Sequence, residues 1–96
     1  MSDLSVQREV TPSKGRYVIR SAEGESELTY SAVSSSLVIA DHTEVAPGLE
    51  SQGIGRKLLD ALLADARAEG FKIVPLCPYV NAQRRKHPEW ADLFQV

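Results

Sequence analysis

The first half of the chain alternates between apolar and polar side chains with a period close to two. Residues 16–20 place Tyr17 and Ile19 on one face, and residues 27–33 continue the same alternation. This pattern is typical of half-buried strands, so it predicts one strand over each segment. Residues 22–25 between them have the sequence Ala-Glu-Gly-Glu, which favours a hairpin turn.

A third strand is predicted where the apolar positions become consecutive. Residues 37–40 have the sequence Leu-Val-Ile-Ala and follow a serine-rich turn at residues 34–36. A continuous apolar run indicates a strand that is covered on both faces, so we expect this strand to be central. Pro47 then favours a loop. The polar residues 1–10 leave room for one edge strand around Val6.

From residue 53 to residue 69 the apolar period changes to that of a helix. Apolar residues recur at intervals of four between Ile54 and Ala66, and Gly70 provides a natural stop. Residues 71–76 then predict a short apolar strand. Pairing along this strand should be interrupted at Pro75, because proline has no backbone N–H to donate.

A short basic helix is predicted next, over residues 79–86, and it should end at His87 and the proline after it. The order of these elements is typical of an α+β fold in a single domain spanning residues 1–96. The strands at 37–45 and 71–76 flank a helical crossover, so they are expected to lie parallel and adjacent. A functional site is expected at their carboxyl ends.

Composition restricts the classes of function. The 96 residues include 11 Lys and Arg and 13 Asp and Glu, and the net charge of -2 gives no overall attraction to nucleic acid or to an anionic membrane. Cys77 is the single cysteine, and the first residues carry charges where a signal peptide would be apolar. We therefore expect a reduced, cytoplasmic protein that does not span a membrane.

Residues 50–57 bring two glycines, Gly53 and Gly55, to the start of the predicted long helix. Glycines let backbone N–H groups approach a ligand closely, and the amides of a helix N-terminus attract anions. The segment is a candidate phosphate-binding turn, and a glycine turn without a ligand is the alternative. A P-loop is excluded because Ile54 follows where lysine is required, and a dinucleotide fingerprint is excluded because Leu58 replaces its third glycine.

Four blocks of sequence carry a family resemblance. They are residues 42–45 (His-Thr-Glu-Val), 52–55 (Gln-Gly-Ile-Gly), 74–79 (Val-Pro-Leu-Cys-Pro-Tyr) and 87–92 (His-Pro-Glu-Trp-Ala-Asp). In this order they resemble a small single-domain subgroup of the GNAT superfamily of acyl-CoA-dependent N-acetyltransferases. The resemblance covers nearly the whole chain. It implies a mixed antiparallel and parallel sheet with one long helix and a short C-terminal helix.

The resemblance also implies acetyl-CoA as the cosubstrate. In the superfamily, the backbone after the central strand and the amides of the glycine turn hold the pantetheine and the pyrophosphate, and two parallel strands separate to admit the thioester. In this chain Pro75 would mark that separation. The implied CoA-binding residues are Val45, Gln52, Gly53, Ile54, Gly55, Arg56 and Lys57. For Arg56 and Lys57 a solvated surface position is the alternative.

Two positions depart from the superfamily pattern. Glu50 stands where the glycine turn usually has Gln or Arg, so a carboxylate is expected near the pyrophosphate, where like charge would weaken binding. Gln83 stands where a tyrosine often protonates the departing CoA thiolate, and an amide cannot supply that proton. Any acid must therefore lie elsewhere.

Four residues are candidates for proton transfer. Cys77 and Tyr79 follow the interrupted strand, where a thiol or a phenol could protonate the thiolate. Cys77 could instead attack the thioester, or pack as a small apolar side chain. His42 and Glu44 end the central strand, and strand alternation places both on one face as candidate bases for the ammonium proton. A capped strand end and a solvated loop are their alternatives.

Together these features predict an acetyl-CoA-dependent N-acetyltransferase in which an amine attacks the thioester directly. Two alternatives stay open: an acyl-CoA-binding or sensing module with little transfer, and an acyl carrier that uses Cys77. The acceptor is unidentified. Because the stretch after the last helix is short, the amine side of the groove is expected to be open or completed by another subunit. An open groove favours a bulky acceptor such as a protein lysine.

The remaining residues give weaker indications. Trp90 and the apolar residues after it should pack back on the sheet edge or form a small contact in a homodimer, so a monomer or a weak homodimer is expected. Residues 84–86 form a basic run that is expected to be a solvated helix face, with a position near the CoA 3′-phosphate or an acidic acceptor as the alternative. Cys77, His42 and His87 match no short metal-binding motif, so no metal is expected.

Overall fold

The computed structural model describes residues 5–96. Residues 1–4, the start of the predicted polar lead, lie outside the described residues. The elements are β1 (Gln7–Val10), β2 (Lys14–Ser21), β3 (Gly24–Ser34), β4 (Leu37–Glu44), the 3-10 turn η1 (Glu50–Gln52), α1 (Ile54–Glu69), β5 (Lys72–Pro75), α2 (Pro78–Lys86) and the 3-10 turn η2 (Pro88–Leu93). Every predicted strand and helix is present.

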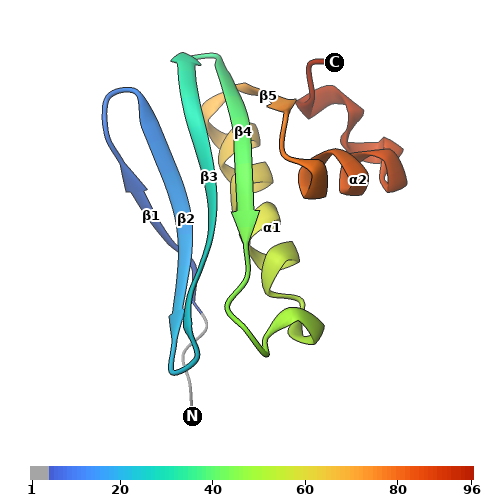
Figure 1. Ribbon diagram of the computed structural model, residues 1–96. Helices are drawn as coiled ribbons and strands as arrows, with labels where there is room; N and C mark the ends of the chain where they lie inside the picture. Colours follow the sequence, from blue (N-terminus) through green and yellow to red (C-terminus); the bar gives the residue numbers. More distant parts are fainter. Residues whose placement is uncertain (1–4) are drawn as a thin grey trace.

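The strands form one mixed sheet in the order β1-β2-β3-β4-β5 (Figure 1). β1 to β4 pair antiparallel with their sequence neighbours, and β4 pairs parallel with β5 across the α1 crossover. The predicted hairpin turn, serine turn and parallel pair are thereby confirmed, and so is the α+β class. The edge strand β1 begins one residue after Val6.

α1 lies against one face of the sheet, behind it in the view of Figure 1. Its buried side chains pack on the apolar side chains that β2, β3 and β4 direct toward it, among them Tyr17, Leu28 and Val38. Gly53 and Gly70 flank the helix, and both have left-handed backbone angles that suit glycine. The predicted stop at Gly70 is confirmed. No helix in the described residues is long and apolar enough to cross a membrane.

The prediction that residues 37–40 are covered on both faces is wrong. Val38 and Ala40 are buried under α1, whereas Leu37 and Ile39 are only half-buried on the opposite face. The error has a physical origin: a continuous apolar run usually indicates two covered faces, but here a single helix layer covers one face only. β4 is also an interior strand rather than the middle one.

The residues after α2 pack back on the molecule. η2 buries Trp90 and Leu93, and Phe94 bridges to Ile73 of β5, where the Gln95 N–H donates to the Ile73 carbonyl at 2.9 Å. This segment therefore extends the sheet edge beside β5, as one of the two sequence-based alternatives predicted.

A polar cluster ties the edge strand β1 to α1. The Arg8 guanidinium donates to Glu69 at 2.5 Å and to the Tyr30 hydroxyl at 2.9 Å, and it lies 3.2 Å from Asp65. Asp65 also accepts a hydrogen bond from the Tyr17 hydroxyl at 2.8 Å. The cluster joins three strands to the end of the helix.

The ring of Tyr30 in this cluster lies directly over Gly15, where a Cβ atom would come within 2.2 Å of the ring. We expect Gly15→Ala to displace the buried ring and to lower the free energy of unfolding by about 1–3 kcal/mol, a typical cost of overpacking. Urea denaturation measures the change. In a Tyr30→Leu background the added methyl should cost much less, and an equal cost in both backgrounds would contradict the assigned contact.

Candidate active site

The carboxyl end of β4 leads through η1 into the start of α1, at the lower end of the molecule in Figure 1. Gly53 caps α1 with φ 69°, and the first helical bond is donated by the Lys57 N–H to the Gly53 carbonyl at 3.0 Å. The preceding amides of the first turn have no intrahelical acceptor. In the described part of the chain no side chain caps them and no acidic residue occupies this turn. Their N–H groups and the positive end of the helix dipole can attract an anion.

The two glycines of this turn have different structural roles. Gly53 needs its left-handed conformation, and a Cβ atom there would meet open space. Gly55 is buried, and a Cβ atom there would lie 3.2 Å from the Cζ atom of Tyr79. Gly55 therefore permits a close approach between α1 and the first turn of α2. The sequence pattern relates both glycines to a ligand and gives no sign of this packing role.

The Arg56 side chain is held by a stack of rings. Its guanidinium lies 4.8 Å from the centroid of the Trp90 ring and donates to Asp60 at 2.9 Å. The His87 ring stacks on Trp90 with a centroid separation of 4.1 Å, and its Nδ1 lies 2.9 Å from a Glu89 oxygen. A backbone hydrogen bond and then His87 lower the pKa of Glu89. The stack fixes a cation beside the N-terminus of α1.

The other residues expected on the CoA side lie around the same turn. Val45 is half-buried against the core, and Gln52 and Lys57 are exposed. Ile54 is buried at the first position of α1. The Glu50 side chain, for which like-charge repulsion was expected, lies outside the described parts of the chain.

The pairing of β4 with β5 ends at Pro75, as predicted. Their last register pair joins Ala40 to Pro75, and the Cys77 N–H still donates to the Ala40 carbonyl at 2.8 Å. β4 continues through residues 41–44 without a partner on this side, among the described residues. This unpaired length of β4 leaves backbone donors and acceptors open to a ligand.

Cys77 and Tyr79 lie on the α1 side of this opening. Cys77 is 2% exposed, and its Sγ atom lies 3.2 Å from the Oγ1 atom of Thr43. Tyr79 is half-buried against Gly55, and this burial raises the pKa of its phenol. A tyrosine in this state keeps its proton at neutral pH and can donate it.

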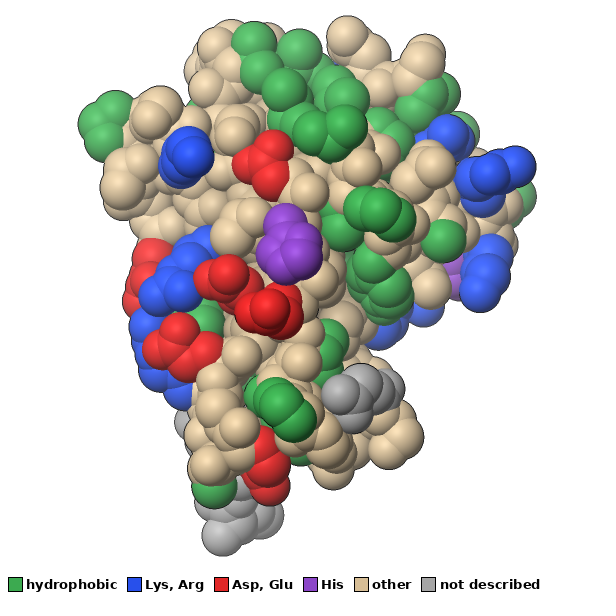
Figure 2. Space-filling model, in the orientation of Figure 1, with side chains coloured by type: hydrophobic (Ala, Val, Ile, Leu, Met, Phe, Trp, Pro, Cys, Tyr) green, Lys and Arg blue, Asp and Glu red, His purple; other side chains and the backbone are tan. Residues whose placement is uncertain are grey.

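His42 and Glu44 lie on the opposite face of β4, and both are exposed. His42 pairs with Thr29 and Glu44 with Glu27, so the predicted placement of both on one face is confirmed. Figure 2 views this face, on which several acidic side chains lie close together. The four catalytic candidates are therefore divided between the two faces of the sheet.

Several contacts near this site were not predicted from the sequence. Thr43 lies 34 residues from Cys77 along the chain, and the buried Ser26 accepts the Ala46 N–H at 2.8 Å where β4 ends. A one-residue bulge at Asp41 shifts the register between β3 and β4. Strand periodicity cannot reveal such long-range partners.

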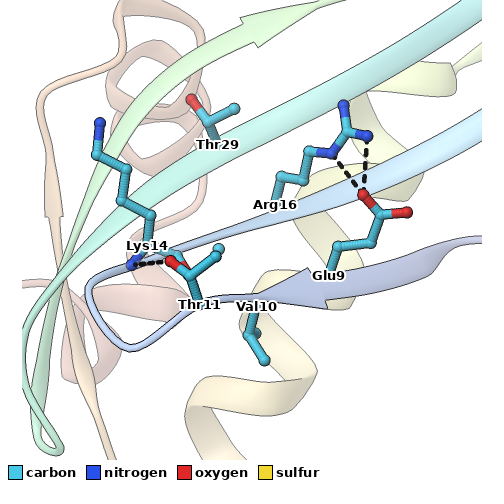
Figure 3. A pocket seen from close by; sticks show the side chains of 7 residues that line it. Glu9, Val10, Thr11, Lys14, Arg16 and Thr29 are labelled. Atoms are coloured by element: carbon cyan, nitrogen blue, oxygen red, sulfur yellow. Dashed lines mark hydrogen bonds and ion pairs between the residues drawn. The ribbon is translucent and has the colours of Figure 1, made fainter.

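A cavity of about 270 Å³ lies elsewhere, between β1, β2 and β3 (Figure 3). Its lining includes Glu9, Thr11, Lys14 and Arg16. Arg16 is engaged by Glu9 at 2.8 Å, so the guanidinium and the carboxylate satisfy one another. The cavity shares no residue with the predicted site.

Tyr79 and Tyr17 give the protein a predictable response to alkaline pH. Burial is the main cause that raises the pKa of each phenol, so the unfolded chain loses these protons first, near pH 10. The free energy of unfolding should therefore fall as the pH rises above about 10. Urea denaturation across this range measures the slope, which Tyr79→Phe should reduce. An unchanged slope in that variant would contradict the burial of its phenol.

Comparison with known proteins agrees with this architecture. The sequence model of the GCN5-related N-acetyl-transferase family matches residues 16–93. The solution structure of a GCN5-like candidate N-acetyltransferase from Staphylococcus aureus superposes with a TM-score of 0.77 at 29% identity, covering 99% of this chain and 91% of that one. No functionally curated protein matches. The family match extends over more than half of the residues, and the chain belongs to the GCN5-related N-acetyltransferase family.

Proposed function

We propose that the protein transfers the acetyl group of acetyl-CoA to an amine by direct attack of the amine on the thioester. The observation that carries this proposal is the unpaired length of β4, residues 41–44, which runs toward the uncapped N-terminus of α1. Membership of the family supports acetyl transfer. The acyl donor and the amine are what the proposal adds.

The donor side of the site would use backbone groups for most of its contacts. The open edge of β4 offers N–H and C=O groups to the pantetheine amides, and the free amides of α1 suit the pyrophosphate. The Arg56 guanidinium, fixed by Trp90 and Asp60, adds a positive charge beside them. The residues proposed to bind acetyl-CoA are Val45, Gln52, Gly53, Ile54, Gly55, Arg56 and Lys57.

Bond changes would occur where β4 and β5 separate. The amine nitrogen bonds to the acetyl carbon, the carbon–sulfur bond breaks, and the electron pair leaves on the CoA sulfur. His42 or Glu44 takes the ammonium proton on the exposed face, and Tyr79 or Cys77 returns a proton to the sulfur from the α1 side. The division of the candidates between two faces supports this scheme, because the base and the acid act on different atoms.

A binding or sensing module with little transfer is the second candidate. His42 and Glu44 are exposed, so neither is enclosed in a dry pocket that would favour proton transfer. The third sequence-based alternative, an acyl carrier on Cys77, is weakened by the 2% exposure of that residue, since a nucleophilic thiol has to reach the thioester. The same burial favours the half-buried Tyr79 over Cys77 as the acid.

Acetyl-CoA binding can be tested with a matched pair of glycine variants. Gly53 and Gly70 cap opposite ends of α1 with φ of 69° and 78°, and a Cβ atom meets open space at both. Gly53→Val and Gly70→Val should therefore cause similar backbone strain. We expect Gly53→Val alone to weaken acetyl-CoA binding, by about tenfold or more, because its side chain obstructs the free amides. Calorimetric titration measures the affinity.

In the same titration, residue-resolved NMR should show shifts at residues 45–57 in the wild-type protein. Equal affinities of the two glycine variants, or shifts confined to other residues, would overturn the proposed donor site. Binding without any release of free thiol across a panel of amines would favour the sensing module.

The source of the proton for the leaving thiolate can be tested with Tyr79→Phe and Cys77→Ala. Loss of the true acid should slow release of free thiol by about 10²-fold, a typical general-acid contribution, while acetyl-CoA affinity changes by a few-fold at most. Thr43→Val is the control, because it removes the hydrogen-bond partner of Cys77 but keeps the thiol. Unchanged rates in both variants would exclude both residues as the acid.

A further inference from the structure

The face of the sheet opposite α1 carries an apolar strip next to the acidic end of β4. Leu37 and Ile39 of β4 and Val74 of β5 are half-buried and lie outside the core. Ile39 pairs with Val74 across the parallel ladder, so their side chains are neighbours. In Figure 2 the upper part of this face shows clustered hydrophobic side chains, with acidic side chains below them.

The bulge at Asp41 places the apolar strip and the polar residues His42 and Glu44 on the same face of the sheet. Ile39 pairs with Ser31, whose hydroxyl donates to Asp41 at 2.7 Å, so Ile39 and Asp41 share the open face. Strict alternation would then turn His42 and Glu44 toward α1. The register shift between Ala40 and His42 returns both to the open face, in line with the apolar strip.

The opposite side of the opening between β4 and β5 is closed. Cys77 and Val80 are buried at 2% and 0% exposure, and Thr43 contacts Cys77 there. Tyr79 packs on Gly55 beside them. An acceptor therefore has access to a thioester in the opening from the face that carries the strip.

The charges on this face favour a cation. Arg16 and Arg20 are engaged by acidic neighbours within β1 to β3. Glu44 has no ion-pair partner among residues 5–96, whereas Glu27 across from it is paired with Arg16 at 2.8 Å. An incoming ammonium group would supply the counter-charge that Glu44 lacks and would lie beside His42.

We propose that this face binds a protein segment in which a lysine is flanked by apolar residues. The proposal rests on the proposed function and specifies its acceptor. The β3 partners of Ile39 and Glu44 are Ser31 and Glu27, which are four residues apart, so at about 3.3 Å per residue this part of the face spans about 13 Å. That length exceeds a small polar amine and suits an extended peptide. The lysine ammonium lies near Glu44, and an apolar neighbour covers Ile39 and Val74.

Three acceptors test this assignment: a lysine peptide with leucine and valine flanks, the same peptide with serine flanks, and spermidine. We expect the KM for the apolar peptide to be at least about tenfold below that for the serine peptide, since it alone buries apolar area. With the apolar peptide, Val74→Thr and Ile39→Thr should raise KM several-fold and leave kcat and acetyl-CoA affinity unchanged. Val10→Thr is the control, because Val10 is 63% exposed on the distant edge strand β1.

Peptide binding without acetyl-CoA, followed by NMR shifts at Leu37, Ile39 and Val74, gives a readout that does not depend on transfer. Equal KM values for the two peptides, shifts elsewhere, or transfer to spermidine alone would overturn the acceptor assignment and leave the proposed function intact. Self-association of the protein through these three residues would also overturn the peptide assignment, because the occupant of this face would then be a second copy of the chain. Failure to bind acetyl-CoA, with peptide shifts present, would instead overturn the proposed function.

Discussion

The separation of β4 from β5 is the constraint on which the rest of the site depends. The Leu76 N–H, which strand alternation would direct at the Ala40 carbonyl, donates back to the Val74 carbonyl at 3.0 Å, and β5 ends in a bend after Pro75. Cys77 then returns to Ala40 for one last bond. Four residues of β4 keep an open edge as a result. Every feature of the proposed site, from the exposed bases to the first turn of α2, is arranged around that edge.

An open edge of this kind needs rigid surroundings. α1 is fixed by its buried face and by the Arg8 cluster at its far end, so its N-terminus is presented at a constant position. The Tyr79 ring against Gly55 links that N-terminus to α2, and the ring stack on Arg56 links it to η2. The donor-binding turn is thus supported from the sheet and from the C-terminal segment together.

Much of this architecture follows from local patterns. The four-residue spacing of apolar side chains predicts α1, and Gly70 predicts where this helix ends. Pro75 predicts where the pairing of β4 and β5 ends. These three features depend on backbone chemistry that a few neighbouring residues determine. The family blocks brought together the residues proposed for acetyl-CoA. The apolar run of β4 predicted that both faces of this strand are covered. Leu37 and Ile39 are as apolar as core residues, but a single helix layer leaves their face of the sheet open.

Other features of the site were not predictable from the chain alone. Nothing in the order Ala-Asp-His distinguishes a bulged Asp41 from a regular strand residue, yet the bulge decides which face receives His42 and Glu44. The contact between Thr43 and Cys77 depends on how far β5 runs before it bends. The packing of Tyr79 on Gly55 likewise depends on the angle between two helices.

The ring stack beside α1 has a consequence for spectroscopy. The chain contains one tryptophan, and its ring contacts both the Arg56 guanidinium and the His87 imidazole. Its indole emission therefore comes from a single, defined location, a few ångströms from the cation at the head of the helix. Any event that draws Arg56 away, or that changes the charge on His87, alters the electric field at that chromophore. The protein thus carries its own optical probe, and no label is needed to follow events at this turn in real time.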